Sequence, residues 1–296
     1  MSRMPRVLVS GATSQIGVRL LPRLVHAGFD VFATSRSRDP GRCDGVNWLH
    51  GDISGAAGIS GLPRPIDAAI HLAPLSLLPA HLPTLLAHGC RRIICFGTTS
   101  RHAKAASANA HEQAFAAAQV EAEREIARQC SAAGAHWTVF RPTLIYGCGM
   151  DRNVSLIARI IRRFGVFPLF GAAAGRRQPV HADDLAIACM AVLDARAAFD
   201  KAYDLTGGET LSYREMVRRI FDALGRPPRF VAVPMALFRF AMGILSLFPR
   251  FRDFNAEMAR RMNEDLVFDC TPAVRDFGYS PRTFQPQFDA VANDAR

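Results

Sequence analysis

Glycine and hydroxyl residues gather where the first β-branched run of the chain ends. The segment Ser10-Gly11-Ala12-Thr13-Ser14-Gln15-Ile16-Gly17 lies between the strand-like residues 6–10 and a helical pattern over 15–27. Glycines in such a turn let the backbone approach a pyrophosphate, and the free amides at the helix start bind it. The pattern therefore predicts nucleotide binding, with an ordinary tight turn as the alternative. The residues predicted to bind are Gly11, Thr13, Ser14, Gln15, Ile16 and Gly17.

The residues after the second predicted strand, 30–34, indicate which nucleotide is bound. An acidic residue about 20 positions after the glycine turn accepts a hydrogen bond from a ribose hydroxyl, whereas an arginine accommodates a 2′-phosphate. Here the strand runs into Ser35 and Arg36. We therefore expect these two residues to contact the cofactor, with NADP(H) favoured over NAD(H). A solvated loop arginine is the alternative interpretation of Arg36.

Hydroxyl groups and one of the two lysines of the chain follow the fifth predicted strand, 92–96. Thr98 and Thr99 come directly after this strand, and Lys104 lies five positions further on. Lysine can shift its pKa and act as an acid or a base where arginine cannot. Threonines at this place can also cap the next helix, and a lysine can be simply exposed to solvent, so both interpretations stay open.

Short β-branched runs alternate with longer helical patterns through the first half of the chain. This alternation predicts an α/β fold, a doubly wound parallel Rossmann sheet covered by helices. After Pro142, glycines separate shorter elements. We predict a nucleotide-binding domain over 1–145 with a return segment near 178–200. A smaller C-terminal substrate-binding lobe is expected from 146–177 and 201–296.

Several motifs together resemble the extended short-chain dehydrogenase/reductase superfamily, which includes nucleotide-sugar epimerases and dehydratases. They are the loop at 10–17, Gly51-Asp52-Ile53, Ile70-His71-Leu72-Ala73, the segment Arg141-Pro142-Thr143-Leu144-Ile145-Tyr146-Gly147, and Pro179-Val180-His181-Ala182-Asp183-Asp184. The resemblance covers nearly the whole chain. It implies further cofactor contacts from Asp52, Ile53, Leu72, Ala73, Pro74 and Thr98.

In this family a tyrosine exchanges a proton with a substrate oxygen and a lysine lowers the pKa of that tyrosine; the resemblance implies that both are replaced in this chain. When the long helical pattern is anchored on Ala122-Glu123, the family's tyrosine and lysine positions hold Phe115 and Gln119. Phenylalanine has no proton to give, and glutamine has no charge to lower the pKa of a neighbour. The resemblance implies a hydroxyl partner at Thr99. The catalytic candidates are Thr99, Lys104 and Tyr146, although Tyr146 has the alternative of packing beside the cleft.

Arginines and a histidine are the candidates for holding a substrate. Arg176 and Arg177 have the geometry to bind a phosphate, with solvated loop arginines as the alternative. His181 matches a family position, where it can also bond within its own lobe.

The resemblance implies an NAD(P)-dependent oxidoreductase or epimerase. It would transfer a hydride to or from a sugar nucleotide or a lipid-linked sugar, with a non-standard acid/base. The loss of the tyrosine and lysine favours an alternative. In that case the chain is a catalytically silent NADP(H)-binding sensor or structural protein that docks on a partner or a membrane.

Composition narrows the remaining classes. The 296 residues are 49 % hydrophobic and 21 % charged, which excludes a disordered or collagenous chain. The net charge is +10, but no basic run is longer than two residues, so we expect no nucleic-acid partner. The seven cysteines form no CxxC pair, which argues against a structural metal site and fits a reducing cytoplasm. The apolar segment 234–251 leaves peripheral membrane contact open, and a homodimer is compatible with the sequence.

Overall fold

The computed structural model describes residues 3–37, 43–51, 61–151, 153–233 and 261–288. The chain divides into two compact units. Unit 1 comprises 1–143, 180–206 and 268–281, and unit 2 comprises 144–179, 207–267 and 282–296. The predicted cofactor residues Asp52 and Ile53 and the apolar segment 234–251 lie outside the described residues.

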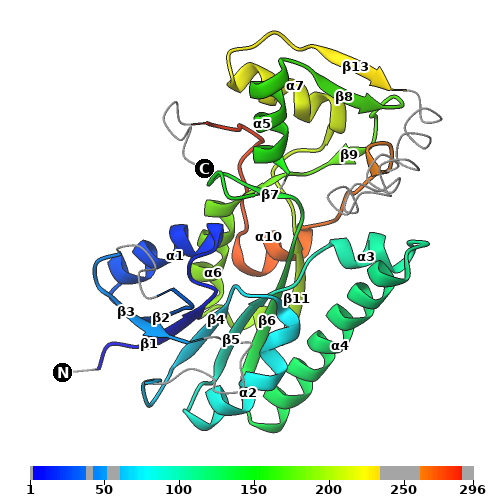
Figure 1. Cartoon of the computed structure of the whole chain (residues 1–296). Coiled ribbons are helices and arrows are strands. Elements are labelled where there is room, and N and C mark those ends of the chain that lie inside the picture. Colours follow the sequence, from blue (N-terminus) through cyan, green and yellow to red (C-terminus); the bar gives the residue numbers. More distant parts are fainter. Residues whose placement is uncertain (1–2, 38–42, 52–60, 152, 234–260, 289–296) are drawn as a thin grey trace. The chain divides into compact units, whose positions relative to one another are not determined.

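A parallel sheet forms the centre of unit 1 (Figure 1). Within the described residues it has seven strands in the order β3-β2-β1-β4-β5-β6-β11, and every neighbouring pair is parallel. This is the Rossmann order, in which the chain winds outward from β1 in both directions, so the predicted fold class is confirmed. The strands are β1 (Arg6–Ser10), β2 (Asp30–Ser35), β3 (Val46–His50), β4 (Ala68–His71), β5 (Arg92–Phe96), β6 (His136–Pro142) and β11 (Lys201–Leu205).

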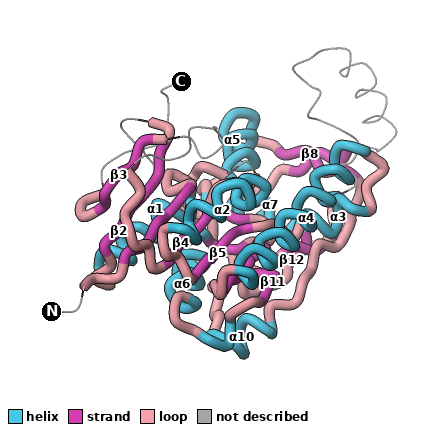
Figure 2. The backbone as a smooth tube through the Cα atoms, turned by 90° about the horizontal axis from the view of Figure 1, so that it is seen from below, coloured by secondary structure: helices cyan, strands magenta, loops and turns pink. Residues whose placement is uncertain are grey.

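Helices connect the strands of unit 1, and α2 and α4 lie side by side (Figure 2). The α-helices are α1 (Gln15–His26), α2 (Leu78–Ala87), α3 (Ser100–Ala105), α4 (Ala110–Ala132), α6 (Ala182–Val192) and α10 (Thr271–Phe277). Two 3₁₀ turns are η1 (Leu75–Leu77) and η2 (Arg196–Ala198). Local polar groups set the helix starts. Asn109 accepts a hydrogen bond from the amide of His111 at 2.9 Å and so begins α4 at its first turn.

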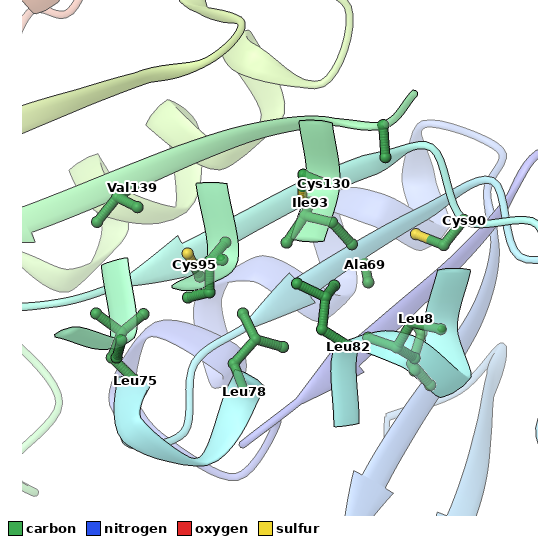
Figure 3. Packing of buried hydrophobic residues seen from close by; sticks show 14 of the residues in the cluster. Leu8, Ala69, Leu75, Leu78, Leu82, Cys90, Ile93, Cys95, Cys130 and Val139 are labelled. Carbon is green, nitrogen blue, oxygen red and sulfur yellow. The ribbon is translucent and has the colours of Figure 1, made fainter. Parts of the chain in front are cut away.

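The core of unit 1 lies on both faces of the sheet. One face packs against α2 and α4 through a cluster that includes Leu8, Leu82 and Ile93 (Figure 3). Val7 and Val9 alternate with Leu8 along β1 and are fully buried as well, on the opposite face. Strands buried on both faces are rich in aliphatic residues, and this explains why the short β-branched runs could be recognised in the sequence.

Unit 2 contains shorter elements around its own apolar cluster. They are β7 (Ile145–Tyr146), α5 (Val154–Phe164), β8 (Phe167–Phe170), β9 (Arg176–Arg177), β12 (Leu211–Ser212), α7 (Tyr213–Ala223) and β13 (Phe230–Val233). The cluster joins α5 and α7 through Ile161, Val217 and Phe221. β8 pairs with β13 in parallel, and β9 pairs with β12 in antiparallel orientation.

The course of the chain differs from the predicted boundaries after residue 200. β11 pairs with β6 along its whole length and completes the large sheet, and α10 also belongs to unit 1. The sequence analysis assigned both segments to the second lobe. The return segment is therefore longer than expected; it begins with β10 (Val180–His181) and α6 and ends with β11.

Candidate functional site

The glycine turn after β1 touches the backbone that follows β4, its neighbour in the sheet. The amide of Leu72 donates to the carbonyl of Ser10 at 2.8 Å. Gly11 has φ +69°, and a Cβ placed there would lie 2.6 Å from the amide nitrogen of Ala73. Here the strand order reverses, which is where dinucleotides bind in sheets of this kind. Gly11, Leu72 and Ala73, which are predicted cofactor residues, therefore lie in contact at the switch point, where sheets of this kind have their dinucleotide crevice.

The start of α1 also has the features of a pyrophosphate-binding turn. Ser14 caps the helix, with its Oγ accepting from the amide of Gly17 at 3.3 Å. A Cβ at Gly17 would lie 2.0 Å from the carbonyl oxygen of Ala12, so only glycine allows the helix to approach its own turn this closely. The turn and the amides of the first helical turn fit a pyrophosphate without any side chain in between. The bound group would be a nicotinamide nucleotide.

A buried histidine joins the two strands at this crevice. His71 Nδ1 lies 2.7 Å from Ser10 Oγ, and its Nε2 lies 3.1 Å from the carbonyl oxygen of Pro74. A carbonyl can only accept, so Nε2 carries the proton and Ser10 donates its hydroxyl proton to Nδ1. Burial lowers the pKa of His71 to about 4, which keeps the ring neutral.

The end of β2 presents the residues expected to select the cofactor. Ser35 is buried, and its Oγ accepts from the amide of Ser37 at 3.0 Å. Arg36 is exposed beside it. The carbonyl of Ser35 also accepts from the amide of Gly51 at 3.0 Å, which ties the end of β2 to the end of β3.

The hydroxyl groups after β5 have defined partners. Thr99 is buried, and both its amide and its Oγ1 donate to the carbonyl oxygen of Pro142, at 3.2 and 3.1 Å. Thr98 Oγ1 accepts from the amide of Ser100 at 3.1 Å, at the start of α3. Because the Thr99 proton is engaged, this hydroxyl can offer a substrate only a lone pair.

Lys104 lies against Phe115, the residue that the sequence analysis predicted at the family's tyrosine position. Its Nζ lies 4.1 Å from the centre of the Phe115 ring, a cation–π contact between α3 and α4. Gln119 is buried on the same helix, and its Oε1 would lie 3.6 Å from a Cβ at Gly97. The long helix therefore places Gln119 at the carboxyl end of β5, next to Gly97.

Charged residues that the sequence analysis did not assign to the site lie at the same end of the sheet. Glu123 on α4 accepts two hydrogen bonds from Arg141, at 2.9 and 2.5 Å, and pairs with Arg101 at 2.7 Å. Arg141 Nη1 lies 3.6 Å from Asp204 Oδ1. The other carboxylate oxygen of Asp204, Oδ2, lies 3.8 Å from Nε2 of His102. Burial opposes the charge of Arg141, but its bonds to Glu123 outweigh burial and raise the pKa of Arg141.

The candidate substrate residues have structural partners of their own. In unit 2, Arg176 is exposed and pairs with Asp265 at 2.8 Å. Arg177 is buried, and its guanidinium donates to backbone carbonyls, including that of Glu264 at 2.6 Å. In unit 1, His181 Nδ1 accepts from the amide of Asp183 and caps α6.

Tyr146 is a core residue of unit 2. It is 1 % exposed and packs edge-on against Phe284, with ring centres 4.8 Å apart. Its hydroxyl donates to the carbonyl of Thr283 at 3.4 Å and accepts from the amide of Gln285 at 3.3 Å. These contacts correspond to the packing role that the sequence analysis gave as the alternative.

Comparison with known proteins agrees with this geometry. The model of the NAD dependent epimerase/dehydratase family matches residues 82–205. The predicted resemblance to the extended short-chain dehydrogenase/reductase superfamily is thereby confirmed, and family and relatives point to an NAD(P)-dependent enzyme of that type.

Two relatives differ in what they do. The 2-alkyl-3-oxoalkanoate reductase of Stenotrophomonas maltophilia is 25 % identical over 315 residues, covering 94 % of this chain and 95 % of that protein. NADH dehydrogenase [ubiquinone] 1 alpha subcomplex subunit 9 of Arabidopsis thaliana is 29 % identical over 101 residues, covering 34 % of this chain and 25 % of that protein.

Solved structures share the fold. UDP-glucose 4-epimerase from Thermotoga maritima, determined with UDP-glucose, superposes with a TM-score of 0.67 at 15 % identity, over 93 % of each chain. The dTDP-glucose 4,6-dehydratase from Streptomyces venezuelae, determined with NAD bound, has a TM-score of 0.66 at 20 % identity, over 94 % of this chain and 92 % of that one.

Two searches of the described residues bear on other kinds of site. No group of three or more His, Cys, Asp or Glu side chains is arranged there to hold a metal ion. Nor do the described ranges include a helix with the length and hydropathy needed to cross a bilayer.

Proposed function

We propose that this chain is an NAD(P)-dependent oxidoreductase or epimerase that transfers a hydride to or from a carbon of a small molecule, with a sugar nucleotide or a lipid-linked sugar as the substrate class. The observation that carries the proposal is the glycine turn between β1 and α1, packed against the backbone after β4 at the switch point of the sheet. A Cβ at Gly11 or at Gly17 would strike backbone atoms, so both positions lack a side chain and a pyrophosphate can approach the backbone of the turn.

Different residues around the crevice bind different parts of the nucleotide. The amides at the start of α1 hold the pyrophosphate, with Ser14 fixing the helix start. Leu72, Ala73 and Pro74 form the opposite wall, and Thr98 lies at the next strand end. When bound, the nicotinamide supplies or accepts the hydride.

The substrate oxygen needs a partner for its proton. Thr99 accepts a hydrogen bond from a substrate hydroxyl, because its own proton is held by the carbonyl of Pro142. The proton itself comes from α3 or from a water molecule, with Lys104 as the candidate taken from the sequence. The cation–π contact with Phe115 holds its ammonium at the helix pair.

Arg36 is proposed to favour NADP(H) over NAD(H). It is exposed directly after β2, where a 2′-phosphate would lie. Replacing Arg36 by alanine should raise the Kd of NADPH about tenfold, the equivalent of about 1.4 kcal/mol, and leave the Kd of NADH unchanged. Equal effects on the two nucleotides would overturn this assignment.

Calorimetric titration with NADPH and NADH, followed by a panel of substrates, tests the function as a whole. The panel holds UDP- and dTDP-sugars together with a 3-oxoalkanoate, because the oxoalkanoate reductase is a relative over nearly the whole chain. Consumption of bound NADPH, or an epimerised sugar, supports the enzyme. Lys104→Ala should then slow turnover, while Lys201→Ala serves as the control, since Lys201 pairs with Asp276 at 2.8 Å.

A second candidate function is a silent NADP(H)-binding sensor or structural protein. Phe115 and Gln119 on the long helix favour it, and so does the match to a subunit of a respiratory complex. It predicts tight NADPH binding with no turnover of any member of the panel. Turnover that is lost in Thr99→Ala would exclude it.

A further inference from the structure

A histidine on α3 lies next to a carboxylate at the end of the sheet where the crevice opens. His102 Nε2 is 3.8 Å from Asp204 Oδ2, and its ring centre is 5.7 Å from that of Phe268. The side chain of His102 is 44 % exposed, whereas that of Asp204 is 21 % exposed. Nε2 therefore faces the carboxylate, and the side chain of His102 remains partly open to solvent.

The position of His102 follows from the strand ends. Its amide donates to the carbonyl of Thr99 at 3.0 Å, so it lies one turn beyond the threonine that follows β5. Asp204 lies opposite Arg141 in the parallel pairing of β11 with β6. His102 therefore follows β5 and Asp204 lies on β11, with β6 between the two strands. Both residues lie at the carboxyl edge of the sheet, where ligands bind in sheets of this type.

Asp204 is held in place by charge. Its Oδ1 faces Arg141, which is fixed by two hydrogen bonds to Glu123, and Glu123 also pairs with Arg101. The charges therefore alternate in sign along Arg101, Glu123, Arg141 and Asp204, and the series ends at His102. The groups facing His102 are the Asp204 carboxylate and, behind it, the Arg141 guanidinium.

The same unit contains a similar pair at the opposite edge of the sheet. His136 begins β6, its Nδ1 lies 2.8 Å from Asp200 Oδ2, and its ring stacks on Phe199 at 4.5 Å. Its side chain is 49 % exposed, close to the value for His102. His136 lies at the amino end of the strand, away from the edge where ligands bind, and this makes it a matched control.

We propose that His102, oriented by Asp204, transfers the proton in the hydride transfer assigned above; the proposal rests on that function. In the reducing direction the substrate carbonyl carbon gains a hydride from the reduced nicotinamide, which is oxidised. The electron pair of the C=O π bond moves onto oxygen, and this oxygen takes a ring N–H proton of the His102 imidazolium to give an alcohol. The exposed ring then regains a proton from water. In the oxidising direction each transfer reverses.

The first test needs no substrate. Diethyl pyrocarbonate acylates neutral imidazoles, and mass spectrometry of the digested protein reports each histidine separately. Saturating NADPH should slow the modification of His102 and leave that of His136 unchanged. Equal rates at His102 with and without bound NADPH would overturn its placement at the cofactor site.

The second test uses the substrate found in the panel. His102→Phe keeps an aromatic ring beside Phe268 but has no proton, and we expect kcat to fall by about 100-fold or more with the Kd of NADPH unchanged. His102→Gln should show the same loss, and His136→Gln none.

The outcomes separate the two proposals. A chain that binds no NADPH, or that turns over no member of the panel, overturns the function and the role of His102 together. Turnover that survives in His102→Phe overturns the role of His102 alone and returns the proton transfer to Lys104. A fall in kcat in Asp204→Asn that is smaller than in His102→Phe, with NADPH binding intact, supports Asp204 as a positioning residue.

Discussion

Replacing Gly11 by alanine should damage both stability and nucleotide binding, and Gly28 offers the matched control. The two glycines have similar backbone angles, φ +69° and φ +82°, but a Cβ at Gly28 would meet no atom within 4 Å. A left-handed angle costs an alanine about 1–2 kcal/mol. Gly28→Ala should lower the free energy of unfolding by this amount and leave the Kd of NADPH unchanged.

Gly11→Ala carries a further cost, because its Cβ would lie 2.6 Å from the Ala73 amide nitrogen and 2.7 Å from the Leu72 carbonyl carbon. These are backbone atoms that cannot rotate away. Overpacking of this kind adds about 1–3 kcal/mol, so the total loss should be about 2–5 kcal/mol. The turn can relieve the clash by opening, but it must close again around the nucleotide. If about 1.4–2.8 kcal/mol of the strain returns in the complex, the Kd of NADPH rises about 10- to 100-fold.

Urea unfolding followed by circular dichroism and calorimetric titration with NADPH measure the two effects. Equal stability losses in Gly11→Ala and Gly28→Ala would show that the β1 turn does not press against the β4 segment. An unchanged Kd of NADPH in Gly11→Ala would show that the nucleotide binds elsewhere.

The remaining predictions concern titration and buried charge. Burial holds the pKa of His71 at about 4. A histidine in an unfolded chain has a pKa near 6.5. As the pH falls from about 6.5 to 4, the unfolded chain therefore binds a proton that the folded chain does not. The free energy of unfolding of the wild type should fall by about 3 kcal/mol over this range. His71→Gln should lack this loss, and urea midpoints across that pH range measure the difference; parallel curves would count against a buried neutral ring. Glu123→Gln leaves two half-buried guanidinium groups without their shared carboxylate and should cost about 3–5 kcal/mol. Glu125→Gln, which loses an exposed pair with Arg128 on the same helix, should leave the unfolding curve almost unchanged, and similar curves for the two variants would refute the reasoning.

Local patterns were sufficient to predict most of the sheet. The predicted strands at 6–10 and 92–96 agree with β1 and β5, because buried parallel strands are rich in aliphatic residues. β11 was missed as part of the sheet. Its sequence Lys-Ala-Tyr-Asp-Leu is short and mixed, and only pairing with β6 shows where it belongs.

The candidate site, too, could be predicted from the sequence only in part. The glycine turn is contiguous in the sequence, so its role could be predicted from spacing alone. The contact of Gly11 with Ala73 and the pairing of His102 with Asp204 join residues far apart in the chain. Such pairs depend on the order of strands in the sheet, and a single sequence carries no direct signal for that order.

β11 is synthesised well after its partner strand β6, and this affects the chain during translation. During synthesis from the N-terminus, β6 is complete well before residues 201–205 leave the ribosome, and the 144–179 portion of unit 2 comes between them. Until then one side of β6 has unpaired amides and carbonyls, an edge that can pair with another chain. A fragment ending near residue 143 would keep this exposed edge permanently and should aggregate. A fragment that ends at residue 281, with short linkers in place of residues 144–179 and 207–267, would retain the partner strand and is the better choice for isolating unit 1.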